Sequence, residues 1–548
     1  MTSAACARRV PSRTPCARKP AASPRISGDG LQRPTRWPPP DAVPCSPERP
    51  QAEERDERWA RVEGGGARIV SLEATPILLI AAYAAAVVIY IISENRRPQT
   101  AFAWMLLFFA IPALGIVIYW IFGRAHPDFG KTRKLRRQSL PVHLARTLRD
   151  AGLRHEAHLD AFAHPTRERL ARLVRASADA LVTGGNRVEL LQDAGEAYPR
   201  LLDDLRGARR SIHLQYYSWG ADELGEELLR LLGAKVAEGV AVHILYDPIG
   251  SISHMGPRYR RRMAAAGVRM VPFSPLWRVH TISYRNHRKI AVIDGEIGHT
   301  GGLNIGDEHV DPGPGVGVWR DTNLRFTGPA VRALQSVFFV DWTNATGEIL
   351  AAEADFPPLG PEPADGVPVQ LCLSGPDSRW RAIRQQYFAM IAGARHRIRA
   401  QTPFFILDDT IAEALKTAAL SGVDVEIMVS ARGPGQLVPS WAANTYMQEV
   451  TAAGVKVFLY EAGYLHAKTI TVDGEVASVG SANWDIRSFS INYELNAIVY
   501  DADFARRLDA DFERDLAQCS PFRLSEYRRR AGILRFRDSA ARLASPLL

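Results

Sequence analysis

The chain has 548 residues, of which 46% are hydrophobic and 23% are charged, and its formal net charge at pH 7 is +9. This length allows two or more domains with cores of their own, and the composition excludes a wholly disordered chain. The basic balance favours an anionic partner, and the five cysteines lack the spacing of metal ligands and predict no disulfide framework.

The first segment, residues 1–66, is rich in Pro, Arg, Ser and Ala and has hardly any apolar periodicity. Such a segment cannot bury enough apolar surface to offset the entropy lost on ordering. We therefore expect a disordered tail.

Two uncharged runs follow within residues 67–124, at 77–92 and 101–122. As a helix, the second run would rise about 33 Å and cross a bilayer core. The first run is shorter but lengthens if Pro76 begins the helix and Ser93 ends it. We predict a transmembrane hairpin with spans at about 76–93 and 101–122. Buried core helices, or a signal peptide for the first run, are the less favoured alternatives.

Basic residues are more frequent after the second run than in the turn between the runs. This bias predicts that both flanks, and the domains that follow, lie in the cytoplasm. The same basic residues would meet the headgroups of an anionic leaflet. Residues 125–182 are expected to form a basic helical connector.

Strands alternate with helices twice along the remaining chain, which predicts an α/β sheet in each of two halves, 183–362 and 363–548. The first half is predicted to have strands at 187–191, 211–219 and 241–247 and helices at 197–208 and 223–238. The second is predicted to have strands at 368–373, 397–402 and 424–429 and helices at 379–394 and 409–421.

Two further stretches allow more than one interpretation. Tyr216, Tyr217 and Trp219 lie near the end of a predicted strand, where aromatic residues belong more often to a core than to a site. Residues 522–548 interleave basic and apolar side chains, as a surface-lying helix or an ordinary docking helix would.

One pattern, H-x-K-x4-D, occurs once in each half. The first copy is His287, Lys289 and Asp294, and the second is His466, Lys468 and Asp473. Each copy alternates with period two up to an Asp-Gly turn signal. The histidine and the lysine of each copy would therefore project from the same face of a strand.

An imidazole beside an ammonium group suits phosphodiester chemistry. One neutral imidazole can attack phosphorus, and a second can protonate the leaving oxygen. Fixed cations and amide donors can hold the phosphate oxygens. We expect Lys289 and Lys468 to supply the charge, and Asn304 and Asn483, each 17 residues after its histidine, to supply the amides.

The reaction needs two histidines, which a duplicated half folded about a pseudo-twofold axis would bring together. Each ring calls for a carboxylate on its other nitrogen, and Asp321 and Glu494 are the candidates. Asp294 and Asp473 end their strands at a turn, so a structural role and a catalytic role both remain open. We include both in the candidate catalytic set.

The double motif and the sequences around it resemble the phospholipase D superfamily and, within it, the bacterial cardiolipin synthases. The similarity covers roughly residues 70–548, and His309 departs from it by standing where the family usually has an aromatic residue. The similar strings are YRNHRK at 284–289, GGLNIGDE at 301–308, WRDT at 319–322, TPFF at 402–405 and GSANWDIRSF at 480–489.

This resemblance implies two phospholipase D-like α/β/α domains with one shared active site, preceded by the membrane hairpin. It implies transfer of a phosphatidyl group between two phosphatidylglycerol molecules, giving cardiolipin and glycerol through a phosphohistidine, with His287 as nucleophile. It also implies a bacterial inner-membrane location, phosphatidylglycerol and anionic lipids as partners, and no nucleic acid, metal or cofactor.

Other functions would use the same residues. A phospholipase D hydrolase, or a transferase with another alcohol acceptor, would share the intermediate. A phosphodiesterase nuclease would also use both histidines, but a membrane hairpin is a poor companion for DNA. A non-catalytic scaffold would have no need for two intact motifs.

Overall fold

The structure is a computed structural model that describes residues 82–93, 98–119 and 165–545, with internal gaps at 278–281, 314, 351–354, 359–362, 364, 432 and 434–436. All the described residues belong to one compact unit, residues 80–548. The predictions for the tail, 1–66, and for residues 125–164 of the connector lie outside the described residues.

A single mixed sheet of 15 strands runs through both halves of the chain. The first half contributes β1 (Val182–Gln192), β2 (Ser211–Tyr216), β3 (Ala241–Tyr246), β4 (Arg269–Pro272), β5 (Ile290–Ile293), β6 (Ile297–Gly301) and β8 (Thr322–Thr327). The second contributes β9 (Val367–Ser374), β10 (Arg397–Thr402), β12 (Asp424–Ser430), β13 (Lys456–Tyr460), β15 (Thr469–Val472), β16 (Val476–Gly480), β18 (Glu494–Val499) and β19 (Cys519–Pro521).

The strand order repeats on either side of the centre of the sheet. One arm runs β1-β8-β6-β5-β2-β3-β4, and the other runs β9-β18-β16-β15-β10-β12-β13-β19. Strands β1 and β9 pair antiparallel where the arms meet. Apart from β19, each strand thus has a counterpart in the same position of the other arm, as a pseudo-twofold axis requires. The predicted fold, two related α/β halves, is confirmed.

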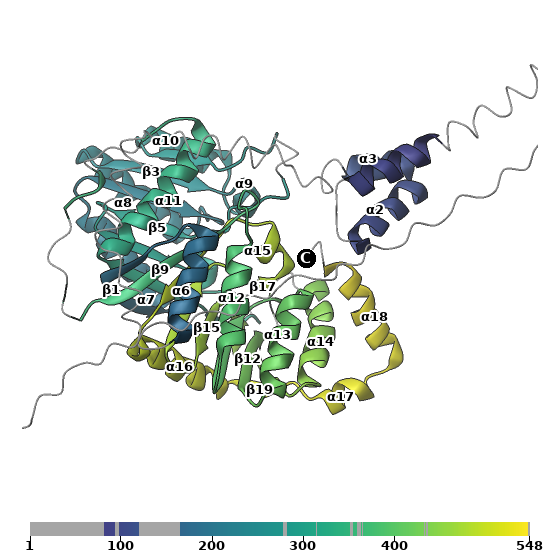
Figure 1. The fold of residues 1–548 in the computed structure, drawn as a ribbon. Helices are drawn as coiled ribbons and strands as arrows, with labels where there is room; N and C mark the ends of the chain where they lie inside the picture. The colour runs from purple at the N-terminus through teal and green to yellow at the C-terminus, as the bar shows by residue number, and fades with distance from the viewer. Residues whose placement is uncertain are drawn as a thin grey trace, which may run out of the picture. The chain divides into compact units, whose positions relative to one another are not determined.

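Helices cover both faces of this sheet (Figure 1). On one face, α11 (Pro329–Thr346) and α16 (Ala502–Leu516) share a core that includes strands from both halves. On the other face each half has its own core. The first is covered by α7 (Asp193–Gly207), α8 (Glu223–Ala237) and α10 (Pro257–Ala265), and the second by α12 (Ala382–Gly393), α13 (Asp409–Leu420) and α14 (Leu437–Thr451).

The Asp-Gly signals form the turns that they predict. Asp294 and Gly295 have φ of 54° and 68°, and Asp473 and Gly474 have φ of 55° and 65°. Two successive positive φ angles define the type I′ turn, which matches the twist of a hairpin. The first turn joins β5 to β6, and the second joins β15 to β16.

The two uncharged runs near the start form helices that pack together. Residues 82–93 are helical, and α2 (Pro98–Ala110) and α3 (Pro112–Ile118) follow. Val87 and Ile91 pack with Phe108 and Tyr119. The second run is divided at Ile111, just before a proline, which lacks the amide hydrogen that a helix interior needs.

None of the described helices has both the length and the apolarity required to cross a membrane. The predicted spans, at 76–93 and 101–122, extend beyond the described residues at both outer ends. The transmembrane hairpin is therefore not confirmed and stays a prediction.

The described end of the connector is helical, as expected. Helix α6 (Pro165–Ala178) places Leu170, Ala171 and Val174 in the core of the second half. The side-chain amide of Gln370 donates to the carbonyls of Ala171 and Ala180, at 3.1 and 2.9 Å. This part of the connector is thus an integral layer of the fold.

Candidate active site

The first motif copy lies in the extended segment that leads into β5. The His287 amide donates to the carbonyl of Tyr493 at 2.9 Å, and the Tyr493 amide donates to the carbonyl of Arg285 at 2.8 Å. Tyr493 belongs to the second half and precedes Glu494. These two backbone hydrogen bonds form a junction between the two halves and hold the segment around His287 beside Glu494.

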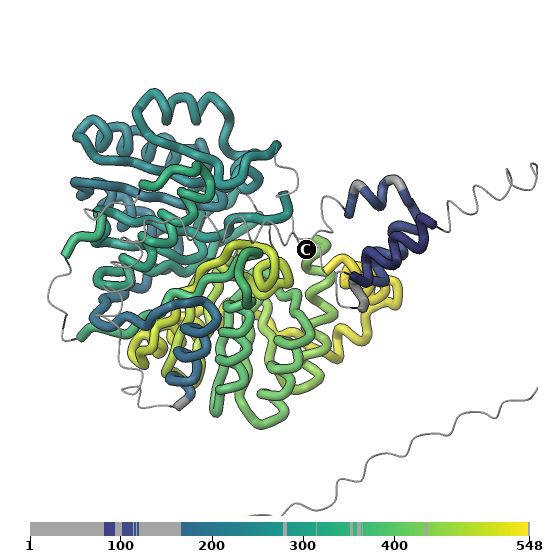
Figure 2. Tube along the Cα trace, turned by 45° about the horizontal axis from the view of Figure 1, so that its top comes forward, coloured from purple at the N-terminus to yellow at the C-terminus, as the bar shows by residue number. Residues whose placement is uncertain are grey.

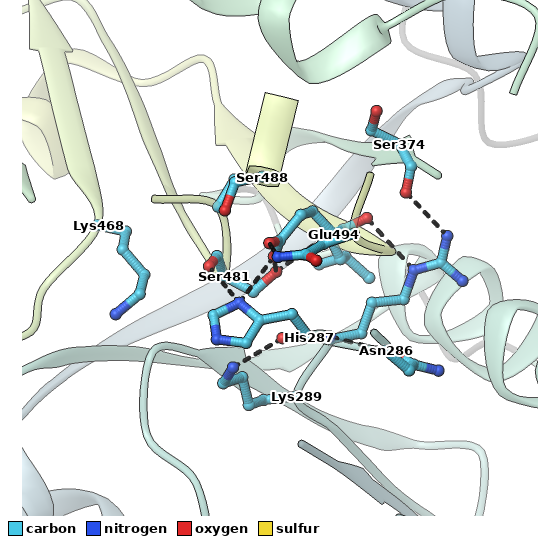
Figure 3. A network of polar contacts seen from close by, with 12 residues as sticks. Asn286, His287, Lys289, Ser374, Lys468, Ser481, Ser488 and Glu494 are labelled. Atoms are coloured by element: carbon cyan, nitrogen blue, oxygen red, sulfur yellow. Dashed lines mark hydrogen bonds and ion pairs between the residues drawn. The ribbon is translucent and has the colours of Figure 1, made fainter. Parts of the chain in front are cut away.

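The His287 ring reaches across the junction. Its Nδ1 lies 3.0 Å from Oε2 of Glu494 and 3.0 Å from the carbonyl oxygen of Ser481 (Figure 3). The Ser481 hydroxyl donates to the same Glu494 oxygen at 2.6 Å. Since both partners of Nδ1 are acceptors, Nδ1 carries the hydrogen and Nε2 keeps its lone pair.

The second histidine repeats this arrangement with the halves exchanged. Nδ1 of His466 lies 2.6 Å from Oδ2 of Asp321, and its amide donates to the carbonyl of Arg320 at 2.7 Å. Strand β14 (Gly463–Leu465), which leads to His466, pairs in parallel with β7 (Val318–Arg320), which leads to Asp321. Each half therefore supplies the carboxylate for the other half's histidine.

The two motif lysines are almost completely buried beside these rings. The Lys289 ammonium donates to the carbonyl of His287 at 2.7 Å, and the Lys468 ammonium donates to the carbonyl of His466. Both side chains are 1% exposed. Burial lowers the pKa of Lys289 to about 7 and that of Lys468 to about 8. Burial therefore makes the charged form of each lysine less favourable in free energy, and a bound anion would offset that cost.

Burial also sets the charge of the histidines. It lowers the pKa of His287, and together with the charge of Lys468 it lowers the pKa of His466 to about 3. Lys468 acts on His287 and Lys289 acts on His466, so the two motif copies lie within electrostatic reach of one another. Both imidazoles are neutral in this structure.

The two carboxylates remain ionised. Burial raises the pKa of Glu494, but the hydrogen bond to His287 and the charge of Lys289 more than offset it. Burial likewise raises the pKa of Asp321, and Lys468 and His466 more than offset that. Each carboxyl group consequently has a pKa below its usual value and can stabilise an imidazolium when one forms.

The asparagines after the motifs occupy corresponding positions. The side-chain oxygen of Asn304 accepts from the Ser218 amide at 3.2 Å, which leaves its Nδ2 without a partner among the described residues. Asn483 is 6% exposed, and its side-chain oxygen has no partner in the part of the chain described. Asn304 thus keeps an amide donor for a ligand, whereas Asn483 keeps an acceptor oxygen and its Nδ2 bonds to Asp485.

The motif aspartates, which the sequence placed in the candidate catalytic set, lie at the hairpin turns and away from the two histidines. The Asp294 carboxylate accepts from the amides of Arg209, Arg210 and Ser211 at 2.7 to 2.9 Å. The whole of β5 separates it from His287, a length of roughly 13 Å at about 3.3 Å per residue. These contacts fix the hairpin turn to the start of β2.

Asp473 does the same in the second half. Its carboxylate accepts from the amides of Arg395, His396 and Arg397 at 2.8 to 2.9 Å, at the start of β10. The structural role, left open by the sequence, is the one that both aspartates have.

Aromatic rings line the two histidines, among them Tyr217, for which the sequence favoured a place in the core. Tyr217 meets the His287 ring edge-on at 5.0 Å, while Trp319 and Tyr464 lie 5.2 and 5.4 Å from the His466 ring. Tyr216 and Trp219 are core residues, as expected. Successive side chains of a strand point to opposite faces, so a core position for Tyr216 indicates that Tyr217 lies on the opposite face.

His309 supports this wall from behind. Its ring stacks on Trp319 at 4.4 Å with an interplanar angle of 8°, as an aromatic residue would. Its Nε2 accepts from the Asn304 amide at 3.1 Å. Burial lowers its pKa to about 3, so the ring is neutral and can accept this bond.

No group of three or more His, Cys, Asp or Glu side chains within the described ranges has an arrangement that could hold a metal ion. The positive charge around the two histidines comes from lysine. Two neutral imidazoles with opposed carboxylates, two ammonium groups and two amides define a phospholipase D-like site, built for a phosphodiester.

Comparisons with known proteins agree with this class. Residues 201–313 and 387–516 match the family described as "Cardiolipin synthase, PLD-like domain", and residues 79–124 match "Phospholipase_D-nuclease N-terminal". The solved phosphatidylserine synthase of Haemophilus influenzae is similar in fold, with a TM-score of 0.53 and 14% identity, covering 69% of this chain and 100% of that one.

Sequence relatives narrow the class. The chain is 39% identical to a cardiolipin synthase of Geobacillus thermodenitrificans over 83% of its own length and 90% of the relative's. It is 37% identical to the major cardiolipin synthase ClsA of Bacillus subtilis, over 84% of its own length and 96% of the relative's. The chain belongs to the cardiolipin synthase family, as its resemblance in sequence indicated.

Proposed function

We propose that this protein is a membrane-associated phosphatidyltransferase that converts two molecules of phosphatidylglycerol into cardiolipin and glycerol. The observation that carries the proposal is the exchanged pairing of His287 with Glu494 and of His466 with Asp321. It gives two neutral imidazoles, each with a free Nε2 lone pair, within one buried, lysine-lined site.

In the first step, Nε2 of His287 attacks the phosphorus of one phosphatidylglycerol. A phosphorus–nitrogen bond forms as the bond to the glycerol headgroup breaks, and the departing oxygen takes a proton from His466. Glycerol leaves, and the phosphatidyl group stays on His287. Lys289, Lys468 and Nδ2 of Asn304 donate to the phosphate oxygens, and Asn483 would join them once its amide turns from Asp485.

The second step reverses the roles. Nε2 of His466 takes the proton from the terminal hydroxyl of a second phosphatidylglycerol, whose oxygen attacks phosphorus. The bond to His287 breaks, and cardiolipin forms. The proton balance closes because His466 gives one proton in the first step and recovers one in the second.

The ligand itself makes His466 an acid. Without substrate, burial and the charges of the two lysines disfavour an imidazolium, so the pKa of His466 is low. A bound phosphodiester adds a negative charge beside the lysines and raises the pKa of every nearby base, so that Nε2 of His466 takes up a proton from solvent before the first step. Asp321 then stabilises the imidazolium through the bond to Nδ1.

Product analysis would test which hydroxyl compound accepts the phosphatidyl group. Purified protein would be given phosphatidylglycerol labelled in its headgroup, in mixed micelles, and cardiolipin and released glycerol would be counted. One glycerol for each cardiolipin is expected. Phosphatidic acid as the main product would identify a hydrolase, and formation of a different diester on adding another alcohol would identify a different acceptor.

The family places this enzyme with membrane phospholipid, and we infer its orientation from the basic residues that follow the second apolar run. The catalytic halves would lie on the cytoplasmic side of a bacterial inner membrane. Protease protection of the catalytic halves in sealed inverted and right-side-out vesicles would test this orientation, since only inverted vesicles should expose them.

A further inference from the structure

A stripe of exposed apolar side chains runs along α18 (Gly532–Leu543). Ile533, Phe536 and Leu543 are 72%, 70% and 85% exposed, and Ala540 between them is exposed as well. Spacings of three and four residues place all four on one helical face. Nothing in the described ranges covers this face, and side chains of this size gathered at a surface mark an interaction site.

The opposite face of α18 is already fixed. Asp538 is completely buried and accepts from Nδ2 of Asn444 at 3.1 Å. Arg542 pairs with Glu449 at 2.8 Å, and its guanidinium lies 4.2 Å from the centre of the Tyr446 ring. Helix α18 lies beside α14 (Figures 1 and 2). Its polar side is docked on α14, and its apolar side is exposed.

Positive charge gathers on the segment that carries the stripe. Residues 522–545 contain seven arginines against two acidic residues. Arg528, Arg529 and Arg535 are exposed and have no carboxylate partner in the described part of the chain, whereas the other four arginines pair with Glu526, Asp538 or Glu449. A helix with large apolar residues on one face and free guanidinium groups beside it suits the boundary between anionic headgroups and acyl chains.

We propose that the exposed face of α17 (Leu524–Arg529) and α18 is a docking surface for a bilayer of anionic phospholipid. The apolar stripe would enter the acyl boundary, and the free arginines would meet the lipid phosphates. Contacts between neighbouring elements link this surface to the active site. Helix α14, which holds α18, contacts β11 (Phe405–Ile406), and β11 pairs with β17 (Trp484–Asp485), directly after Asn483.

The proposal rests on the proposed function only in that the substrate is a membrane lipid. A protein partner could also cover an apolar stripe. The three unpaired arginines on the same segment favour a partner with a uniformly negative surface over a protein surface that carries both signs of charge. The chain offers a matched control in Leu420, which is 75% exposed at the end of α13 and is not on this face.

The first test places a photoactivated crosslinking residue at position 536, and separately at position 420, in the full chain reconstituted with vesicles of radiolabelled phosphatidylglycerol. We expect lipid label on the position 536 variant and at least about tenfold less on the position 420 variant. Equal labelling, no lipid label at 536, or a crosslink from 536 to a second polypeptide would overturn the proposal.

The second test measures turnover of the Ile533→Asp/Phe536→Asp double variant and of Leu420→Asp. On vesicles, the double variant should lose about tenfold in turnover, while in detergent micelles it should stay within about twofold of the unchanged protein. Leu420→Asp should match the unchanged protein in both. No loss on vesicles, or an equal loss in both assays, would contradict a docking role.

The two proposals fail separately in these experiments. If the unchanged protein made no cardiolipin in micelles, the proposed function would fail while the crosslinking result still stood. Thermal unfolding of each variant shows whether the fold is retained.

Discussion

The carboxylate of Asp321 lies 2.6 Å from Nδ1 of His466, which comes 145 residues later in the chain, and Glu494 makes the corresponding contact with His287 across 207 residues. The two contacts are similar but not identical. Ser481 reinforces Glu494, whereas its counterpart Gly302 has no room for a side chain because the Asp321 carboxylate occupies that space. The shorter acid and the glycine fit together in one half, and the longer acid and the serine in the other.

Replacing either histidine by alanine should reduce turnover by at least about a thousandfold, because removing one member of a set that acts as a unit removes most of its effect. Cardiolipin formation in micelles would be measured for His287→Ala and His466→Ala. A variant that kept more than about a tenth of the activity would rule out the two-histidine mechanism.

The two histidines should differ in which one carries the phosphatidyl group. In acid-quenched His466→Ala protein given labelled phosphatidylglycerol with a good leaving group, label should accumulate on His287, because the intermediate forms but lacks the base that resolves it. The His287→Ala protein is the matched control and should stay unlabelled. Label on His466 in that control, and none on His287, would reverse the assignment.

Neutralising one carboxylate should impair the histidine of the opposite half. Asp321→Asn and Glu494→Gln preserve size but no longer stabilise an imidazolium, so each should lower kcat by about a hundredfold to ten-thousandfold with a smaller effect on KM. Asp321→Asn should lose more, since His466 is the ring that must carry the proton. The opposite order would argue that His287 is the acid.

The motif aspartates should affect stability rather than chemistry. Asp294→Ala and Asp473→Ala each leave three backbone amides without their acceptor, which should lower the free energy of unfolding by about 1 to 3 kcal/mol. Urea unfolding and the kcat of the folded fraction would be measured together. A large loss of kcat with unchanged stability would return these residues to the catalytic set.

The sequence predicted the strands and helices well where local pattern decides them. The predicted strand at 397–402 coincides with β10, and the predicted helix at 223–238 differs from α8 by one residue. Strand β5 begins only at Ile290, however, after the histidine and lysine that were expected to lie within it. The segment before it is held by Tyr493 of the other half, a contact that no local pattern reveals.

The site residues were found because the repeat marks them, but their pairing was not. Asp321 and Glu494 were predicted as the carboxylates because each histidine ring calls for one, and the sequence gave no means of deciding which served which. The exchange depends on parallel pairing between β7 and β14, two short strands far apart in sequence. The same pairing sets Trp319 opposite Tyr464 and so brings the Trp319 ring to 5.2 Å from the His466 ring.

The pH dependence should follow the buried lysines. Their ammonium forms exist below a pKa of about 7 for Lys289 and about 8 for Lys468, so raising the pH through this window removes the cations that hold the phosphate. We expect kcat/KM in micelles to fall from about pH 7 upward, with kcat falling less because bound phosphate raises both lysine pKa values.

On the acid side, burial lowers the pKa of His287 from the ordinary value of about 6.5, so the nucleophile stays neutral below that value. The acid limb of kcat/KM should therefore begin below the ordinary pKa of histidine. A profile that instead rose through pH 7 to 8 would contradict the assignment of the lysines as cationic phosphate ligands.

The exchange of carboxylates also constrains how the two halves can evolve. A mutation that displaces Glu494 removes the partner of His287 in the other copy. Loss of a site residue from one copy therefore also impairs the other copy. Selection on one half is in effect selection on both. The duplicates are free to diverge along their outer strands and helices, but at the junction a change on one side survives only with a compensating change on the other.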